Sequence, residues 1–213
     1  MGDARCTDLA QLWRGLRAGE IALVSVSYVD SRCFAVLEER PVPNRFSPSA
    51  LACLERVLSG DARKVVAIDS NVHESTVSQH CASVLRGMGQ PTQPHQIPIL
   101  LVMAVYAARG LPLPPARLEG VCPRTARWVI SVELPVRTFR SRLSNAEWEV
   151  ARMLVASYSY AQISRLRGTA VSTVANQLAG AFRKLGISGK AELRTRAVHE
   201  FADAFLRARE ACS

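Results

Sequence analysis

The sequence predicts a mainly α-helical fold with two similar helical units and a small N-terminal β-hairpin or strand element. Three observations predict it. Apolar residues recur at helical spacing over most of residues 43–213, and Ser, Pro and Gly stand where these stretches should begin and end. Strand-like residues gather before residue 42 and again around Trp128.

The first 42 residues are typical of one helix followed by a hairpin. Asp8–Arg17 is amphipathic and predicts a short helix. Glu20–Tyr28 and Cys33–Leu37 are rich in strand-forming residues, and a polar turn at 29–32 separates them. We therefore expect these two segments to pair as antiparallel strands.

Residues 43–110 predict the first helical unit. Ser47 and Pro48 form a helix start, as N-cap and first-turn residue, and Gly60 ends that helix. Further helices are expected at Asp61–Ile68, at Glu74–Met88 and, apolar nearly all round, at Pro98–Ala108.

A linker follows at 111–140, beginning in the Pro-rich stretch from Gly110 to Pro115. It contains a strand at Trp128–Leu134, which could join the hairpin or precede the next helices.

Residues 141–213 predict the second helical unit. Ser144 and Glu147 have the spacing of a capping box, in which the side chain of each residue accepts a hydrogen bond from the backbone N–H of the other. The helix that they open should run to about Ala156. The next helices are expected at Ser159–Leu166, Val171–Leu185 and Glu192 to about Arg209.

The two helical units align without a gap at an offset of 97 residues. Eight of 45 aligned positions are identical, including Ser75-Thr76-Val77 with Ser172-Thr173-Val174 and Gly89 with Gly186. Apolar positions also agree, for example Val66 with Ile163. Two amphipathic three-helix units could match by chance, but the shared tripeptide and final glycine favour an internal duplication.

Charge is concentrated in the second half of the chain. The formal net charge is +9; residues 1–120 carry 12 Lys and Arg against 11 Asp and Glu, whereas residues 121–213 carry 15 against 7. A polyanionic partner is therefore expected to bind mainly there. No membrane contact is expected, because the longest apolar run, Ile97–Ala108, is far shorter than the roughly 20 residues of a membrane-spanning helix.

Six scattered cysteines without a CxxC pair, and an N-terminus without a signal-peptide pattern, predict a cytoplasmic protein with reduced thiols.

The second unit has the order of a helix-turn-helix: a short helix, a tight turn at Arg167–Ala170 and a longer helix at Val171–Leu185. At 100° per residue, one side of the longer helix is apolar and the other is small and polar. Small residues allow the backbone to approach bases, and Asn and Arg can bond base edges or phosphates. The candidate DNA-binding residues are Ser172, Thr173, Asn176, Gln177, Ala179, Gly180, Arg183 and Lys184.

These elements together resemble the LuxR/GerE-type helix-turn-helix. The resemblance covers about 55 residues: Leu143-Ser-x-x-Glu147, Tyr160-Ala-Gln-Ile163-Ser, Ser172-Thr-Val174, Phe182-Arg-Lys-Leu-Gly186 and Ala191-Glu-Leu193. It implies a bacterial, sequence-specific transcription regulator whose third helix, 171–185, enters the major groove of double-stranded DNA. The family often has Lys and His where this chain has Ala175 and Gln177, so its usual consensus site is not expected to carry over.

The first unit has a second, more divergent set of candidate residues, namely Ser75, Thr76, Gln79 and Arg86. Residues 45–89 carry 5 basic and 4 acidic residues, against 6 and 2 in 142–186, so weaker DNA binding is expected there. Two interpretations remain open: both units bind DNA, or the first unit is a degenerate copy that holds another protein or dimerises.

No catalytic, metal or cofactor site is expected, because the four histidines lack metal-ligand spacing and no nucleophile or phosphate-loop motif occurs. The competing interpretation is a protein-interaction adaptor or antagonist acting on RNA polymerase or another regulator through degenerate helix-turn-helix units. A homodimer through the last helix is a further expectation. Leu193, Ala197, Phe201 and Phe205 share one face of it, and could equally cap the core of the unit.

Overall fold

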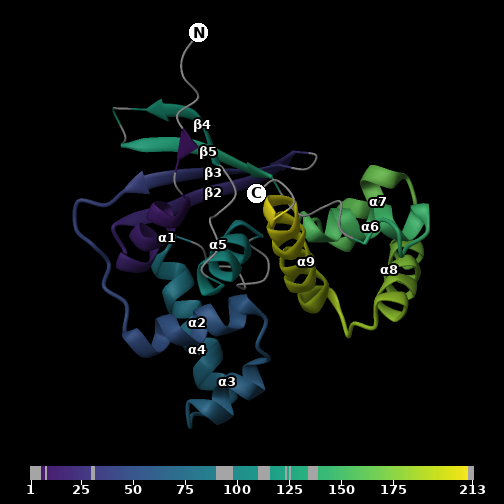
Figure 1. Ribbon diagram of the computed structural model, residues 1–213, viewed down its shortest axis with the longest axis horizontal. Coiled ribbons are helices and arrows are strands. Elements are labelled where there is room, and N and C mark those ends of the chain that lie inside the picture. Colours follow the sequence, from purple (N-terminus) through teal and green to yellow (C-terminus); the bar gives the residue numbers. More distant parts are fainter. Residues whose placement is uncertain are drawn as a thin grey trace. The chain divides into compact units, whose positions relative to one another are not determined.

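The computed structural model describes residues 6–7, 9–29, 32–89, 98–109, 116–122, 124, 126–133 and 139–210. Helix predominates in them, accompanied by one antiparallel sheet (Figure 1). The chain divides into two compact units, Met1–Glu133 and Leu134–Ser213. The first unit contains β1 (Cys6–Thr7), α1 (Leu9–Ala18), β2 (Ile21–Val29), β3 (Arg32–Glu39), α2 (Pro48–Ser59), α3 (Arg63–Asp69), α4 (Glu74–Gly87), α5 (Pro98–Ala108), β4 (Ala116–Cys122) and β5 (Arg127–Glu133). The second contains α6 (Asn145–Val155), α7 (Tyr160–Arg167), α8 (Val171–Leu185) and α9 (Lys190–Glu210).

The sheet of the first unit has the strand order β1-β4-β5-β3-β2, with antiparallel neighbours. β2 and β3 form the predicted hairpin, and the strand expected near Trp128 joins it, since β5 pairs with β3. Alternate residues of β3 are fully buried, as the period of a strand with one covered face requires: Cys33, Ala35 and Leu37. The helices α1 and α5 lie on one side of this sheet (Figure 1).

The sheet is larger than the N-terminal hairpin that the sequence predicts. β4 lies in the segment interpreted as a linker, and it pairs with β5 through a register shift between Leu118 and Gly120. The burial of this strand alternates from Ala116 to Gly120, but the alternation ends at the register shift, so only a short run of the strand shows the period of two. The stretch from Gly110 to Pro115 lies outside the described residues.

Three of the expected helix ends, at Ser47, Gly60 and Ser144, are confirmed by their capping geometry. Ser47 accepts a hydrogen bond from the Ala50 N–H at 3.2 Å, and Gly60 ends α2 in the left-handed conformation with φ of 112°. The Ser144–Glu147 capping box opens α6. These local interactions satisfy backbone groups that a helix end leaves without partners.

The two units share a register as well as a sequence offset. Arg63 and Tyr160 begin α3 and α7, and Glu74 and Val171 begin α4 and α8, each pair 97 positions apart. In the first aligned segment α4 packs on α2 and α3, and in the second α8 packs on α6 and α7. The helix that follows each segment packs on the first helix of that segment: α5 packs on α2, and α9 packs on α6. The aligned segments therefore have the same order of helices and the same packing partners.

Candidate nucleic-acid interface

The α7–α8 corner is fixed by short-range interactions. Ser159 and Gln162 form a second capping box at the start of α7. Gly168 ends the helix in the left-handed conformation, with φ of 61°, and the Ser164 hydroxyl donates to the Thr169 carbonyl at 2.5 Å. Ala170 then takes the N-cap position of α8 without a side-chain cap. The backbone N–H groups at the start of α8 therefore have no side-chain acceptor at the cap.

One side of α8 belongs to the core of the second unit. Val174, Leu178 and Ala181 are completely buried, and Leu185 nearly so. Phe182, expected in the same set, is half-buried. Since these side chains contact α6 and α7, the orientation of α8 about its own axis is set by packing.

The opposite side of α8 is exposed. Ser172, Thr173, Asn176, Ala179 and Arg183 all lie there. Within the described part of the chain, the side chains of Asn176 and Arg183 have no hydrogen-bond or ion-pair partner, so both are available to a ligand. Five of the eight sequence-predicted residues thus form one accessible surface.

Lys184 and Gly180 are engaged with α6 instead. The Lys184 ammonium lies 2.7 Å from the Glu147 carboxylate. A Cβ atom at Gly180 would lie 2.8 Å from the same carboxylate, so the small residue accommodates Glu147. The sequence predicts both residues as DNA-binding residues, but in the structure both contact Glu147 of α6. Hydrogen bonds from Lys184 and then from Ser144 lower the pKa of the Glu147 carboxyl to about 2.

Gln177 is also occupied within the unit. Its side-chain oxygen accepts a hydrogen bond from the Arg167 guanidinium, which also pairs with Glu149 at 3.2 Å. Arg167 thereby connects α6, the end of α7 and α8, and fixes their spacing. Gln177 and Arg167 hold the corner together, and the side-chain oxygen of Gln177 is not free to bind a base while this contact persists.

Arg165 is a surface cation that sequence reasoning missed. It is exposed on the last turn of α7, and the described residues offer it no partner. Leu166 and Val171, next to the turn, are 62% and 47% exposed. The basic last turn of the supporting helix was the signal that could have identified Arg165.

In the first unit, the candidate residues of α4 lie at positions equivalent to those of α8, but their surroundings differ from those on α8. Ser75, Gln79 and Arg86 are exposed and Thr76 is half-buried. The His73 imidazole accepts the Ser75 N–H and lies 2.8 Å from its hydroxyl, so the start of α4, unlike that of α8, is capped by a side chain.

The surface of α3 is apolar where that of α7 is polar. Val65 is 45% and Ile68 is 69% exposed, and the offset of 97 places them at Gln162 and Arg165. Ile68 and Glu74 line a shallow pocket at the α3–α4 corner. An exposed carboxylate and aliphatic side chains are unfavourable next to phosphates, and they suit a protein surface better.

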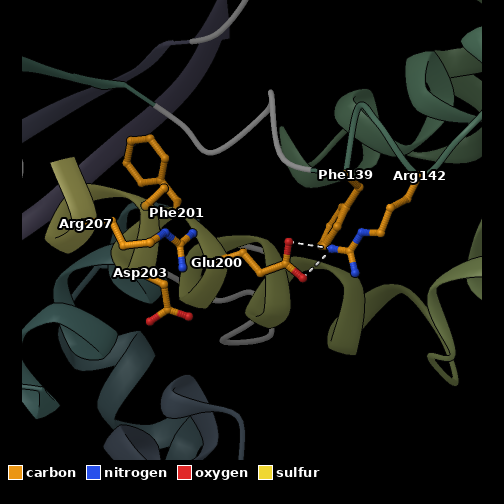
Figure 2. A pocket seen from close by; sticks show the side chains of 7 residues that line it. Phe139, Arg142, Glu200, Phe201, Asp203 and Arg207 are labelled. Carbon is orange, nitrogen blue, oxygen red and sulfur yellow. Dashed lines mark hydrogen bonds and ion pairs between the residues drawn. The ribbon is translucent and has the colours of Figure 1, made fainter.

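The last helix, α9, is mainly a core element. Leu193 and Ala197 are completely buried in the second unit, whereas Phe201 is half-buried and the Phe205 side chain lies outside the described residues. Phe201 lines a pocket that Figure 2 shows, where Arg142 pairs with Glu200 at 2.5 Å. Leu193 and Ala197 therefore cap the core of the second unit and are not accessible to a second chain.

The described residues contain no group of three or more His, Cys, Asp or Glu side chains arranged to hold a metal ion. Burial raises the pKa of the Cys33 thiol to about 12 and that of Cys81 to about 11, so both thiols stay protonated at neutral pH. No described helix combines the length and apolar character needed to cross a membrane.

Comparison of the chain with protein families, with characterised proteins and with solved structures finds no match.

Proposed function

We propose that this chain is a sequence-specific DNA-binding transcription regulator whose second unit is a helix-turn-helix of the LuxR/GerE type. In this proposal α7 is the supporting helix and α8 (Val171–Leu185) is the recognition helix in the major groove. The observation that carries the proposal is the division of α8 into a buried aliphatic side and an exposed side with free Asn176 and Arg183.

The residues on the exposed side have separable roles in this proposal. Asn176 suits the N6 and N7 edge of adenine, and Arg183 suits guanine or a phosphate. Ser172 and Thr173 stand at the start of α8, where free N–H groups and hydroxyls suit a phosphate oxygen. Arg165 adds a phosphate contact from α7. The basic excess of residues 121–213, 15 against 7, supports attraction to DNA.

The test is selection of binding sites from random duplex DNA by the purified full chain, followed by affinity measurements on the selected site. Replacing Asn176 and Arg183 by Ala should weaken binding about 10- to 100-fold, the cost of losing base-edge contacts. The matched control replaces Gln79 and Arg86, the equivalent residues of α4. Failure to enrich any duplex, or full affinity in the α8 variant, would contradict the proposal.

A second role is favoured for the first unit. The exposed Val65 and Ile68 on α3, the cap provided by His73 and the carboxylate of Glu74 all favour contact with a protein over contact with DNA. The partner could be RNA polymerase or another regulator. Unchanged affinity and footprint in the Gln79 and Arg86 variant would support this role, and a shortened footprint would show that both units bind DNA.

A further inference from the structure

Two arginine guanidinium groups lie close to the ring of Trp148 on α6. The Cζ atom of Arg140 is 4.8 Å from the centroid of this ring, and the Cζ atom of Arg152 is 5.4 Å from it. Both distances are within the roughly 6 Å over which an aromatic ring attracts a cation. These three residues, here called the Trp148 cluster, therefore gather two positive charges around a single indole.

The carboxylates of α6 do not neutralise the Trp148 cluster. Glu147 pairs with a lysine of α8 at 2.7 Å, and Glu149 pairs with an arginine at the end of α7 at 3.2 Å. Arg140 donates a hydrogen bond to the neutral side chain of Asn145 at 2.7 Å. Within the described parts of the chain, neither guanidinium of the cluster has an ion-pair partner. The cluster therefore keeps both of its positive charges, while both carboxylates of its helix are already paired.

The cluster also contains hydrogen-bond donors without acceptors. The Nε atom of Arg152 and the Nε1 atom of Trp148 are shielded from solvent, and neither has a partner among the described residues. Guanidinium and indole nitrogens can only donate hydrogen bonds, and a buried donor without an acceptor is unfavourable. A molecule that suits the cluster must therefore bring acceptors and negative charge. The planar guanidinium fork matches the two oxygens of a carboxylate.

The cluster lies on a different side of α6 from the side that contacts α8. Glu147 marks the side towards α8. At about 100° per residue, Trp148 lies about 100° and Arg152 about 140° around the helix from Glu147. The buried side of α8 contacts α6, so the exposed side of α8 is turned away from this helix. A duplex on the exposed side of α8 is therefore expected to leave the Trp148 cluster accessible.

We propose that the Trp148 cluster binds an acidic segment of a protein partner, whose carboxylates pair with Arg140 and Arg152. Charge complementarity identifies this occupant, because two guanidinium groups without a carboxylate need one from outside the chain. The basic excess of residues 121–213, 15 against 7, attracts an acidic protein from a distance. The choice of a protein over DNA rests on the proposed function, in which α8 holds the duplex.

The test is fluorescence anisotropy of a labelled decaglutamate peptide titrated with the full chain, without DNA. Combining Arg140→Gln with Arg152→Gln should weaken peptide binding about tenfold or more, because both charge-assisted contacts are lost. The matched control combines Lys190→Gln with Arg207→Gln. It removes the same charge from the second unit at two exposed cations of α9, and should bind the peptide about as well as the wild type.

Three results would overturn the proposal. The first is a wild-type chain that does not bind the peptide. The second is an equal loss in the two variants, which would indicate general attraction to a chain of net charge +9. The third is a cluster variant that loses as much affinity for duplex DNA as Arg183→Ala does, which would make the cluster a phosphate contact. Because the peptide titration contains no DNA, its result stands even if the chain binds no duplex.

Nuclear magnetic resonance of the unmodified chain gives an independent measurement. The chain has three tryptophans, and the other two, Trp13 and Trp128, belong to the first unit. The indole N–H resonance of Trp148, identified with Trp148→Phe, should shift as decaglutamate is added, whereas the other two should not. Peptide binding that leaves the Trp148 resonance unchanged would contradict the proposal.

Discussion

The Glu147 carboxylate joins three features of the second unit. It accepts the Ser144 N–H at 2.8 Å, pairs with Lys184 at 2.7 Å and occupies the space that a side chain at Gly180 would need. The capping box could be predicted from sequence because its partners are three residues apart. The pairing with Lys184 could not, since it spans 37 residues and depends on how α8 packs against α6.

We predict that Glu147 makes the stability of the chain sensitive to acid. The pKa of its carboxyl falls from an ordinary 4.5 to about 2 on folding. The stabilisation is therefore complete above about pH 4.5 and is lost as the pH falls toward 2. Glu147→Gln should lower the free energy of unfolding at pH 7 by on the order of 2 kcal/mol.

Urea denaturation at pH 7 and pH 3 checks this prediction, and the difference between the variant and the wild type should shrink at the lower pH. The control is Glu74→Gln, which removes the same charge from the first turn of another helix, α4, where no described cation pairs with the carboxylate. An equal effect in both variants would show that general charge, and not the Glu147 contacts, is responsible.

Gly168 gives a second residue-scale prediction. Its φ of 61° is costly for other residues, and a Cβ atom there would meet no neighbour. Gly168→Ala should therefore destabilise the unit by about 1–2 kcal/mol through backbone strain alone. Gly189→Ala is the matched control, since that glycine also faces open space and does not have a positive φ. Thermal denaturation of both variants would measure the difference, and equal melting temperatures would refute the assignment of strain.

At the scale of elements, local signals predicted most of the helices. Ser47, Gly60, Ser144 and Gly168 mark helix ends in the sequence, and α8 has the predicted bounds of Val171–Leu185. α3 begins at Arg63, two residues later than predicted, because its N-cap Ala62 provides no side-chain signal. β4 was missed because only a short run of it shows the period of two, which ends at the register shift with β5.

The start of α8 yields an element-scale prediction with two readouts. Ala170 is the N-cap and makes no side-chain cap hydrogen bond. Ala170→Ser and Ala170→Asp should each stabilise the helix by about 1 kcal/mol, measured by thermal denaturation. In DNA binding the two variants should differ. The new carboxylate would repel a phosphate at the helix start and weaken binding about tenfold, whereas serine should change it little. Equal affinity in both would show that this end of α8 does not face the backbone of DNA.

For the whole molecule, the predominance of helix that the sequence predicts is confirmed. Binding of a polyanion to the more basic half stays a prediction. The sequence alone could not predict which cationic side chains lack an ion-pair partner, because that depends on contacts within each unit. Arg167 and Lys184 are bound to Glu149 and Glu147, whereas Arg165 and Arg183 have no partner among the described side chains. The accessible charge of the second unit is thus smaller than its composition indicates.

Salt should therefore act strongly on the proposed association of this chain with DNA. DNA binding should weaken as salt rises, because each phosphate contact releases counterions. Replacing Arg165 or Arg183 by Ala should reduce the slope of log affinity against log salt by about one each. Lys184→Ala should reduce it less, since Glu147 already neutralises that ammonium. Fluorescence anisotropy with a selected duplex would measure these slopes. Equal slopes in the Arg165, Arg183 and Lys184 variants would contradict the assignment of Lys184 as a paired cation and of the two arginines as free ones.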